Sequence, residues 1–231
     1  MLGLFPEGFE ESERDGELVL SAYTDARGES RMAAAFGDVL ATDVPTDWDE
    51  RWKRFHRPVS AGGIWIVPPW EDPPRDADFV VIDPGRAFGT GAHPTTRLCL
   101  ELLLGEGRGS VLDVGCGSGV LAIAAAKLGH TPVVGVDVDE SAVEATRGNA
   151  GRNDVHVDAR RVDALASPLP RADLALANIA LGAVEELGRR LDARRVVTSG
   201  YLAADIPRLD GFRHVERREL DGWAADVHAR L

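Results

Sequence analysis

The sequence lacks a long run of apolar residues. Its longest uninterrupted apolar stretch, Val120 to Ala126, is far shorter than the ~20 residues that a membrane-spanning helix needs. No lysine or arginine precedes Arg14, so the first residues lack the basic region of a secretory signal peptide. Both absences predict a cytoplasmic protein with no membrane partner.

Cysteine is also scarce. Cys99 and Cys116 are the only two in the chain, they form no CxxC motif, and no pair of histidines lies beside them. Neither a disulfide framework nor a zinc site is therefore expected, and the sequence predicts no metal. Both residues suit small buried positions in a core.

The chain has fewer basic than acidic residues, with 26 Lys and Arg against 38 Asp and Glu, so its net charge is −12. Such a chain repels phosphate backbones, so we expect no direct contact with nucleic acid. Residues 1–60 hold 13 of the acidic and seven of the basic side chains, which is half of the net charge. We expect residues 1–60 to form a small acidic substrate-recognition unit and residues 61–231 the larger domain.

The order of apolar strands and amphipathic helices predicts the fold class. From residue 110 the two alternate, which is typical of a mostly parallel sheet with helices on both faces. The last two strands leave no room for a helix, and Asp221-Gly222 is a hairpin signal, so they should form an antiparallel edge. Strands are expected at 17–24, 64–67, 79–83, 110–114, 132–137, 155–162, 173–178, 195–201, 212–219 and 222–231, and a helix at 46–57, which makes the front a small α+β unit.

A glycine-rich turn, GCGSG, follows the strand at 110–114 and precedes an apolar helix. Its second half also fits the dinucleotide pattern GxGxx[GA], so the motif alone leaves NAD and S-adenosylmethionine open. Asp113 should oppose an anionic pyrophosphate and favour a cationic sulfonium beside Gly115 and Gly117. Asp137, at the end of the next strand, suits the hydroxyls of a ribose. Asp163 is expected near an adenine amino group or as a solvated loop carboxylate.

The stretch from Asp83 to Thr96, DPGRAFGTGAHPTT, is the second candidate ligand loop. Its glycines around Phe88 give a flexible backbone that can fold over a cofactor, with Phe88 and Gly89 as expected contacts. Pro94 suits the first turn of a helix, which would place the Thr96 hydroxyl near its N-terminus. His93 is expected to cap that helix or brace the loop, with general-base catalysis as the alternative.

The end of the strand at 173–178 carries the residue that we expect to act on the substrate. The Asn178 amide oxygen can hold an amine or the cofactor, although Asn is also an ordinary turn residue. We expect Asn178 and the carbonyls of Asn178 and Ile179 to accept hydrogen bonds from an amine. Positioning and desolvation would then do most of the catalysis.

Four segments together resemble one family in wording and order. They read DPGRAFGTGAHPTTRLCLELL, VLDVGCGSGVLAIAAAKLG, GVDVDESAVEATRGNA and LALANIALGAVEEL. The chain, over residues 45–231, resembles the bacterial ribosomal protein L11 methyltransferase (PrmA) family. The resemblance implies the seven-stranded Rossmann-like sheet of S-adenosylmethionine-dependent methyltransferases. It also implies cofactor contacts at Thr96, Gly115, Asp137 and Asn178, and a substrate-docking N-terminal region, which is shortened in this sequence.

The function expected is therefore S-adenosylmethionine-dependent methylation of lysine or N-terminal amines, with a basic ribosomal protein as the partner. The alternatives are a methyltransferase of another protein or of a small-molecule amine, a non-catalytic cofactor-binding regulator, and an NAD-dependent oxidoreductase. Asn178 is followed by Ile-Ala, unlike the Pro-Pro-aromatic pattern typical of nucleobase-amine methyltransferases. The number of methyl groups and the oligomeric state stay open.

Overall fold

The computed structural model describes residues 10–14, 17–21, 26–37, 39–40, 56–83 and 91–231. The chain divides into two compact units, Met1–Asp49 and Glu50–Leu231. The boundary that we expected at residue 60 falls inside β3 (Val59–Ala61), which pairs with β4 (Ile64–Val67) of the second unit. In the described residues, no helix has the length and apolarity needed to cross a membrane.

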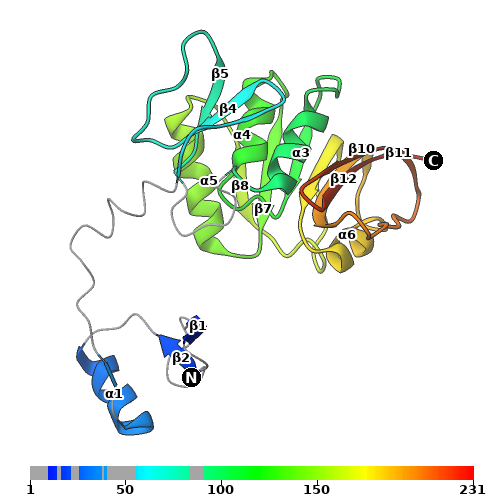
Figure 1. Ribbon diagram of the computed structural model, residues 1–231. Helices are drawn as coiled ribbons and strands as arrows, with labels where there is room; N and C mark the ends of the chain where they lie inside the picture. Colours follow the sequence, from blue (N-terminus) through cyan, green and yellow to red (C-terminus); the bar gives the residue numbers. More distant parts are fainter. Residues whose placement is uncertain (1–9, 15–16, 22–25, 38, 41–55, 84–90) are drawn as a thin grey trace. The chain divides into compact units, whose positions relative to one another are not determined.

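The described residues of the first unit form two strands and a helix (Figure 1). β1 (Glu10–Arg14) and β2 (Glu17–Ser21) form an antiparallel hairpin, and α1 (Ala26–Phe36) follows it. β2 corresponds to the first part of the strand expected at 17–24. Most of the helix expected at 46–57 lies outside the described residues, and its last two, His56 and Arg57, are not helical.

The second unit is built on a seven-stranded sheet, as expected. Its strand order is β11-β12-β10-β9-β6-β7-β8. The five strands from β10 to β8 are mutually parallel, and β12 is antiparallel to both of its neighbours. The bounds are β6 (Val111–Val114), β7 (Val133–Asp137), β8 (Asp158–Arg161), β9 (Ala172–Asn178), β10 (Ala193–Leu202), β11 (Phe212–Leu220) and β12 (Trp223–Arg230).

The C-terminal hairpin turns where the sequence predicted. Leu220 pairs with Trp223, so Asp221 and Gly222 form a two-residue loop. Both have positive φ, 51° and 80°. A type I′ turn requires this backbone at both central positions, which is why Asp-Gly favours it.

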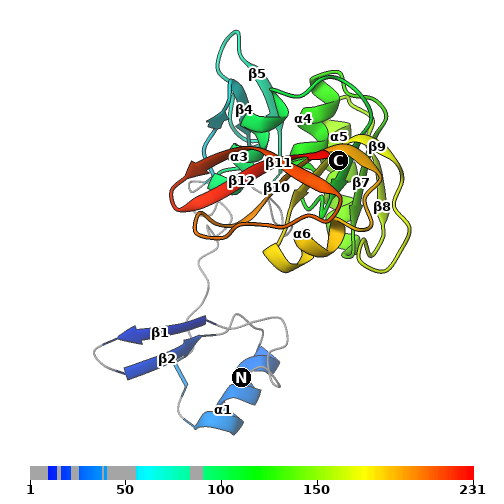
Figure 2. The same cartoon turned by 90° about the vertical axis from the view of Figure 1, so that its right-hand side faces the viewer.

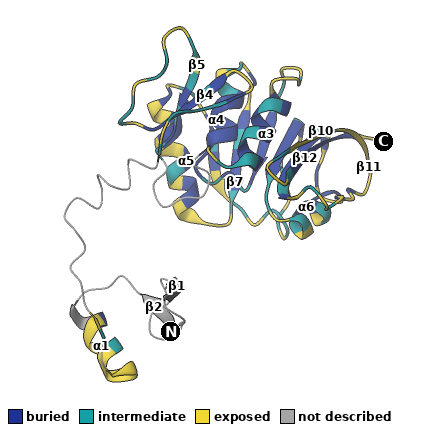
Figure 3. Cartoon of the chain, in the orientation of Figure 1, coloured by how far each residue is buried: buried dark blue, intermediate teal, exposed yellow. Residues whose placement is uncertain are grey.

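Helices cover both faces of the sheet and bury two apolar layers (Figure 3). Successive strand residues alternate between the layers, as Val111 and Leu112 do. Helices α3 and α4 pack on the Val111 side, and α6 packs on the Leu112 side. The helices are α3 (Pro94–Leu103), α4 (Val120–Lys127), α5 (Glu140–Arg152) and α6 (Leu181–Leu187).

A second, three-stranded sheet has the order β3-β4-β5, with β5 at Asp78–Val81 (Figure 2). β4 pairs with β3 antiparallel and with β5 parallel. The connection between β4 and β5 contains the proline pairs Pro68-Pro69 and Pro73-Pro74. Ile66 and Val80 are buried in the same core as α3 and α4, so this sheet is part of the larger unit.

Candidate functional site

The carboxyl ends of the parallel strands meet at one edge of the seven-stranded sheet. Along that edge β6 lies between β7 and β9, so the chain reverses its direction of winding there. Open α/β sheets bind ligands at such a switch point. The glycine turn follows β6, Asp137 ends β7 and Asn178 ends β9. The topology therefore brings these predicted residues to one edge.

The turn between β6 and α4 depends on glycine at three positions. Gly115, Gly117 and Gly119 have φ of 73°, 54° and 83°, which L side chains rarely adopt. A Cβ at Gly115 would lie 2.4 Å from Cγ2 of Ile179, and one at Gly119 would lie 2.9 Å from the Thr146 side chain. Conformation and close packing thus both require glycine here.

The backbone amides of this turn already have acceptors inside the protein. The Gly115 N–H donates to the Val136 carbonyl at 2.8 Å, and the Gly117 N–H donates to Oδ2 of Asp137 at 3.0 Å. The Gly119 N–H donates to the carbonyl three residues earlier, at 2.7 Å. A phosphate-binding loop instead directs successive N–H groups at the anion. The turn therefore suits a diphosphate poorly.

Asp113 lies within β6 beneath α4. Its side chain is buried, and Oδ2 accepts a hydrogen bond from the Ala122 N–H in the first turn of α4, at 3.1 Å. Burial is the main cause that raises the pKa of this carboxyl to about 7; the Ala122 N–H lowers the pKa and the charge of Asp137 raises it. The contact that the structure gives Asp113 is with α4, so its role beside a cofactor stays a prediction.

Asp137 is half-buried at the end of β7. Oδ2 accepts from Gly117, and Oδ1 accepts from the Asp139 N–H at 3.0 Å. A carboxylate offers about four lone-pair positions, so each oxygen can accept one more hydrogen bond. Asp139 itself caps α5 by accepting from the Ser141 N–H at 2.9 Å. Asp137 is therefore not the helix cap and retains the capacity to bind two hydroxyls.

Thr96 and Asn178 meet at the same edge. Thr96 is buried in the first turn of α3, and the Asn178 Nδ2 donates to its Oγ1 at 3.3 Å. The two residues are 82 positions apart in the sequence. Because Nδ2 faces Thr96, the amide oxygen of Asn178 lies on the opposite branch and can serve as an acceptor.

His93 has the capping role that the sequence predicted. It is the N-cap of α3, and its Nδ1 lies 2.8 Å from Oγ1 of Thr95. Its ring packs edge-on against Trp223, with centroids 4.7 Å apart. Sequence reasoning missed Trp223, although its place directly after the Asp221-Gly222 turn puts it at the start of β12, beside β10.

Two glycines allow the ends of three strands to approach closely around Ile179. Gly200, at a bulge in β10, has φ of 101°, and a Cβ there would lie 2.1 Å from the Ile179 carbonyl oxygen. The Ile179 N–H donates to the Ser199 carbonyl at 3.1 Å. Gly115 packs against the Ile179 side chain. These contacts fix the backbone next to Asn178. Gly200 lies against the Ile179 carbonyl, which the sequence analysis expected to accept a hydrogen bond from an amine.

The other predicted cofactor residues are placed differently. Asp163 is exposed, and its Oδ1 accepts from the Leu165 N–H at 2.9 Å. This is the geometry of the solvated loop carboxylate that the sequence left open, while a contact with adenine stays a prediction. Phe88 and Gly89 lie outside the described residues.

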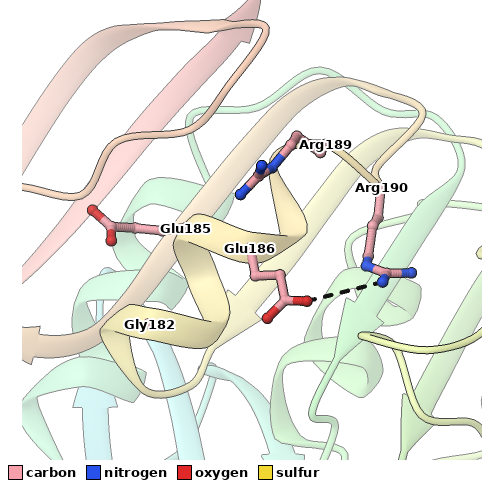
Figure 4. Close-up of a pocket in the computed structure, with 5 residues that line it drawn as sticks. All are labelled: Gly182, Glu185, Glu186, Arg189 and Arg190. Carbon is pink, nitrogen blue, oxygen red and sulfur yellow. Dashed lines mark ion pairs between the residues drawn. The ribbon is translucent and has the colours of Figure 1, made fainter.

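A surface hollow on α6 shares no residue with this edge (Figure 4). Its charged side chains belong to one helix and the turn after it, and Glu186 pairs with Arg190 at 3.9 Å. Exposed pairs of this kind are typical of a solvated helix face. The lining residues are Gly182, Glu185, Glu186, Arg189 and Arg190.

Comparison with known proteins agrees with the fold. The family model for ribosomal protein L11 methyltransferase (PrmA) matches residues 11–205. The chain is 45% identical to the ribosomal protein L11 methyltransferase of Shewanella sediminis over 68% of this chain and 55% of that protein. It is 39% identical to that of Burkholderia ambifaria over 83% and 71% of the two chains.

A solved structure gives the same result. The ribosomal protein L11 methylase of Lactobacillus delbrueckii subsp. bulgaricus superimposes with a TM-score of 0.66 at 30% identity, covering 75% of this chain and 98% of that one. The chain spans about half the length of the Shewanella relatives that it matches. By the extent of these matches, the chain belongs to the ribosomal protein L11 methyltransferase (PrmA) family.

Proposed function

We propose that this chain is an S-adenosylmethionine-dependent N-methyltransferase that modifies lysine or N-terminal amines of ribosomal protein L11. Membership of the family supports the reaction class. The observation that carries the proposal is the contact of Asn178 with Thr96. It sets an amide acceptor beside the glycine turn, at the switch point where a cofactor binds in this class of sheet.

The side chains at this edge fit the cofactor. Asp137 would bind the ribose hydroxyls with the acceptor capacity that Gly117 and Asp139 leave to it. Gly115 and Gly117 would allow the backbone to approach the cofactor closely, since neither carries a Cβ. The internally bonded amides of the turn favour a cationic group over a diphosphate.

When bound, S-adenosylmethionine supplies an electrophilic methyl group. A lysine amine has an ordinary pKa of ~10.4 and must lose a proton to the solvent before it can attack. Asn178 would accept a hydrogen bond from the neutral amine through its amide oxygen and so orient the nitrogen lone pair. Asn178 is half-buried, so an amine bound beside it would lose part of its hydration, which disfavours the charged ammonium form. Orientation and desolvation together then lower the barrier without a dedicated base.

The acidic front of the chain would attract the substrate. Residues 1–60 carry half of the net charge of −12, and the partner expected is a basic ribosomal protein. Association should therefore weaken as salt screens the two surfaces.

The test combines cofactor binding with methyl transfer. Calorimetric titration with S-adenosylhomocysteine should show saturable binding, which Asp137→Ala weakens by at least about 30-fold because two hydrogen bonds to a charged group are lost. Asp192→Ala is the control, since this carboxylate is exposed just before the amino end of β10. Labelled methyl from S-adenosylmethionine should then appear on purified ribosomal protein L11.

Each contrary result removes a different part of the proposal. Binding of NADH in place of S-adenosylhomocysteine would make the chain an oxidoreductase. Cofactor binding with label on another protein or a small amine would change the substrate. Cofactor binding with no labelled acceptor in a whole-cell lysate would leave a non-catalytic regulator.

A further inference from the structure

Three buried polar residues lie along α5, namely Thr146 and Asn149 within the helix and Asn153 at its C-cap, and we call them the α5 polar stripe. Their exposed fractions are 0%, 1% and 5%. Their spacing of three and four residues places them on one face of the helix. Buried polar side chains need hydrogen-bond partners. Most hydrogen-bond partners of the α5 polar stripe are backbone groups of two segments outside α5.

The first segment is the extended chain at the end of β5. Oδ1 of Asn153 accepts from the Val81 N–H at 2.8 Å, and its Nδ2 donates to the Val81 carbonyl at 2.7 Å. One helical turn away, Asn149 does the same with Asp83, at 3.0 and 3.3 Å. The Ile82 N–H points the other way, to the Val67 carbonyl. The two amides thus take the place of a neighbouring strand.

The dimensions of helix and strand explain this match. Four residues of an α-helix rise about 6 Å. Two residues of an extended chain span about 6.6 Å. Asparagines at i and i+4 of α5 can therefore meet residues at i and i+2 of a strand in register.

The second segment is the glycine turn. Oγ1 of Thr146 donates to the Gly117 carbonyl at 3.0 Å, and Nδ2 of Asn149 donates to the Ser118 carbonyl at 2.9 Å. Two consecutive carbonyls are thus held toward α5. Because each peptide group is planar, fixing a carbonyl also fixes the direction of the N–H that follows it. The stripe therefore sets the orientation of the turn as well as its distance from α5.

Asn149 is the member of the stripe that bonds to both segments. Its Nδ2 links the Ser118 carbonyl of the glycine turn to the Asp83 carbonyl beyond β5. Asn153 bonds to Val81 and to the Asn149 carbonyl, but its bonds do not reach the turn. The two asparagines are alike in burial and in number of side-chain bonds, but Asn149 lies inside α5 and bonds to the turn, whereas Asn153 is the C-cap and does not.

We propose that Asn149, assisted by Thr146, is a positioning residue for cofactor binding, because it holds the glycine turn in register with the extended chain at Asp83, just beyond β5. The inference rests on the proposed function, which places the cofactor at that turn. Asn153 joins the end of β5 to α5 and makes no bond to the turn. The same helix face therefore contains one residue that sets the geometry of the site and a matched residue that does not.

The test compares Asn149→Asp with Asn153→Asp. Each change keeps the shape of the side chain, replaces its two N–H donors by an oxygen and adds the same charge, so both should lower the denaturation midpoint similarly. Asn149→Asp should raise the dissociation constant for S-adenosylhomocysteine about tenfold, and Asn153→Asp less than about threefold. Equal changes in the dissociation constant would overturn the proposal.

A second measurement needs no cofactor. Amide hydrogen exchange of residues 115–122 should be faster in Asn149→Asp than in Asn153→Asp, because only Asn149→Asp removes the side-chain hydrogen bond to the Ser118 carbonyl of the turn. If the wild-type chain binds no S-adenosylhomocysteine, the proposed function fails, while this exchange still decides whether Asn149 holds the turn.

A third variant covers the case in which Asn149→Asp does not fold. Thr146→Val keeps the branched shape and removes the donor to the Gly117 carbonyl. It should raise the dissociation constant about threefold or more and speed exchange in the turn. An unchanged constant and unchanged exchange in Thr146→Val would overturn the proposal.

Discussion

Two buried carboxyl groups lie in the two halves of the seven-stranded sheet and are held differently. Asp113, in parallel strand β6, accepts a backbone N–H from the start of α4. Asp226, in antiparallel strand β12, accepts from the Tyr201 hydroxyl at 2.9 Å and lies 2.8 Å from the His214 Nε2. The Arg217 guanidinium is 3.8 Å away.

The difference shows which groups join each half of the sheet to its neighbouring elements. In the parallel half, a helix N-terminus supplies donors through its backbone, so one carboxyl can join a strand to the helix above it. In the hairpin, side chains of β10 and β11 converge on Asp226. A network of side chains therefore ties the hairpin to the parallel sheet.

The largest effect should come from breaking that network. Asp226→Ala leaves the Tyr201 hydroxyl and the Arg217 guanidinium without this acceptor, and we expect a loss of ~3–5 kcal/mol in the free energy of unfolding. Urea denaturation measures it. Asp192→Ala, which removes an exposed carboxylate paired with Arg171 at 3.9 Å, should cost less than about 0.5 kcal/mol. Similar losses in both variants would contradict the network.

Local pattern sufficed to predict the sheet and its hairpin. Each signal depends on a few adjacent residues: the strand and helix periodicity, the GCGSG turn and the Asp221-Gly222 turn. The structure contains the strands, helices and turns that these signals predict. Asn178 was expected at the end of a strand and Thr96 near the N-terminus of a helix, and the structure has both there, but the contact between their side chains was not predicted.

Burial of polar side chains could not be predicted in this way. The sequence pattern singled out neither Asp226 nor Asn149, yet both are polar side chains that are buried. Their partners, Tyr201 and Asp83, are distant in sequence. The hydrogen bond between Asp113 and α4, to which strand alternation turns the side chain, was likewise not predicted, while the expected role of Asp113 beside a cofactor stays a prediction. Such contacts depend on tertiary packing.

The second prediction concerns Asp113 and pH. Its pKa is raised from 3.8 to about 7, so between these values the folded chain holds a proton that the unfolded chain releases. Its contribution to stability is therefore lost as pH rises from about 4 to 7. Asp113→Asn, which keeps an acceptor for Ala122, should remove this loss and add ~2–4 kcal/mol at pH 7. Denaturation at several pH values tests it, and an unchanged slope would contradict it.

The third prediction is the opposite slope in the hairpin. Burial is the main cause that lowers the pKa of His228 from 6.5 to about 4, against the charge of Asp226. The unfolded chain then binds the extra proton, so stability rises with pH from about 4 to 6.5. His228→Gln should remove ~2–3 kcal/mol of this dependence. The fall caused by Asp113 should then appear uncompensated, and a profile identical to that of the wild-type chain would contradict the assignment.

The smallest expected effect compares the contributions to stability of His214 and Tyr201, the two side chains that donate hydrogen bonds to Asp226. His214 is 52% exposed, so water can replace it, and His214→Gln should cost at most ~1 kcal/mol. Tyr201→Phe removes a buried hydroxyl that also contacts Thr198 at 2.7 Å, and it should cost ~1–2 kcal/mol. Urea denaturation of both variants at pH 7 ranks them. A larger loss in His214→Gln than in Tyr201→Phe would mean that the exposed imidazole, rather than the buried phenol, holds the hairpin carboxylate in place.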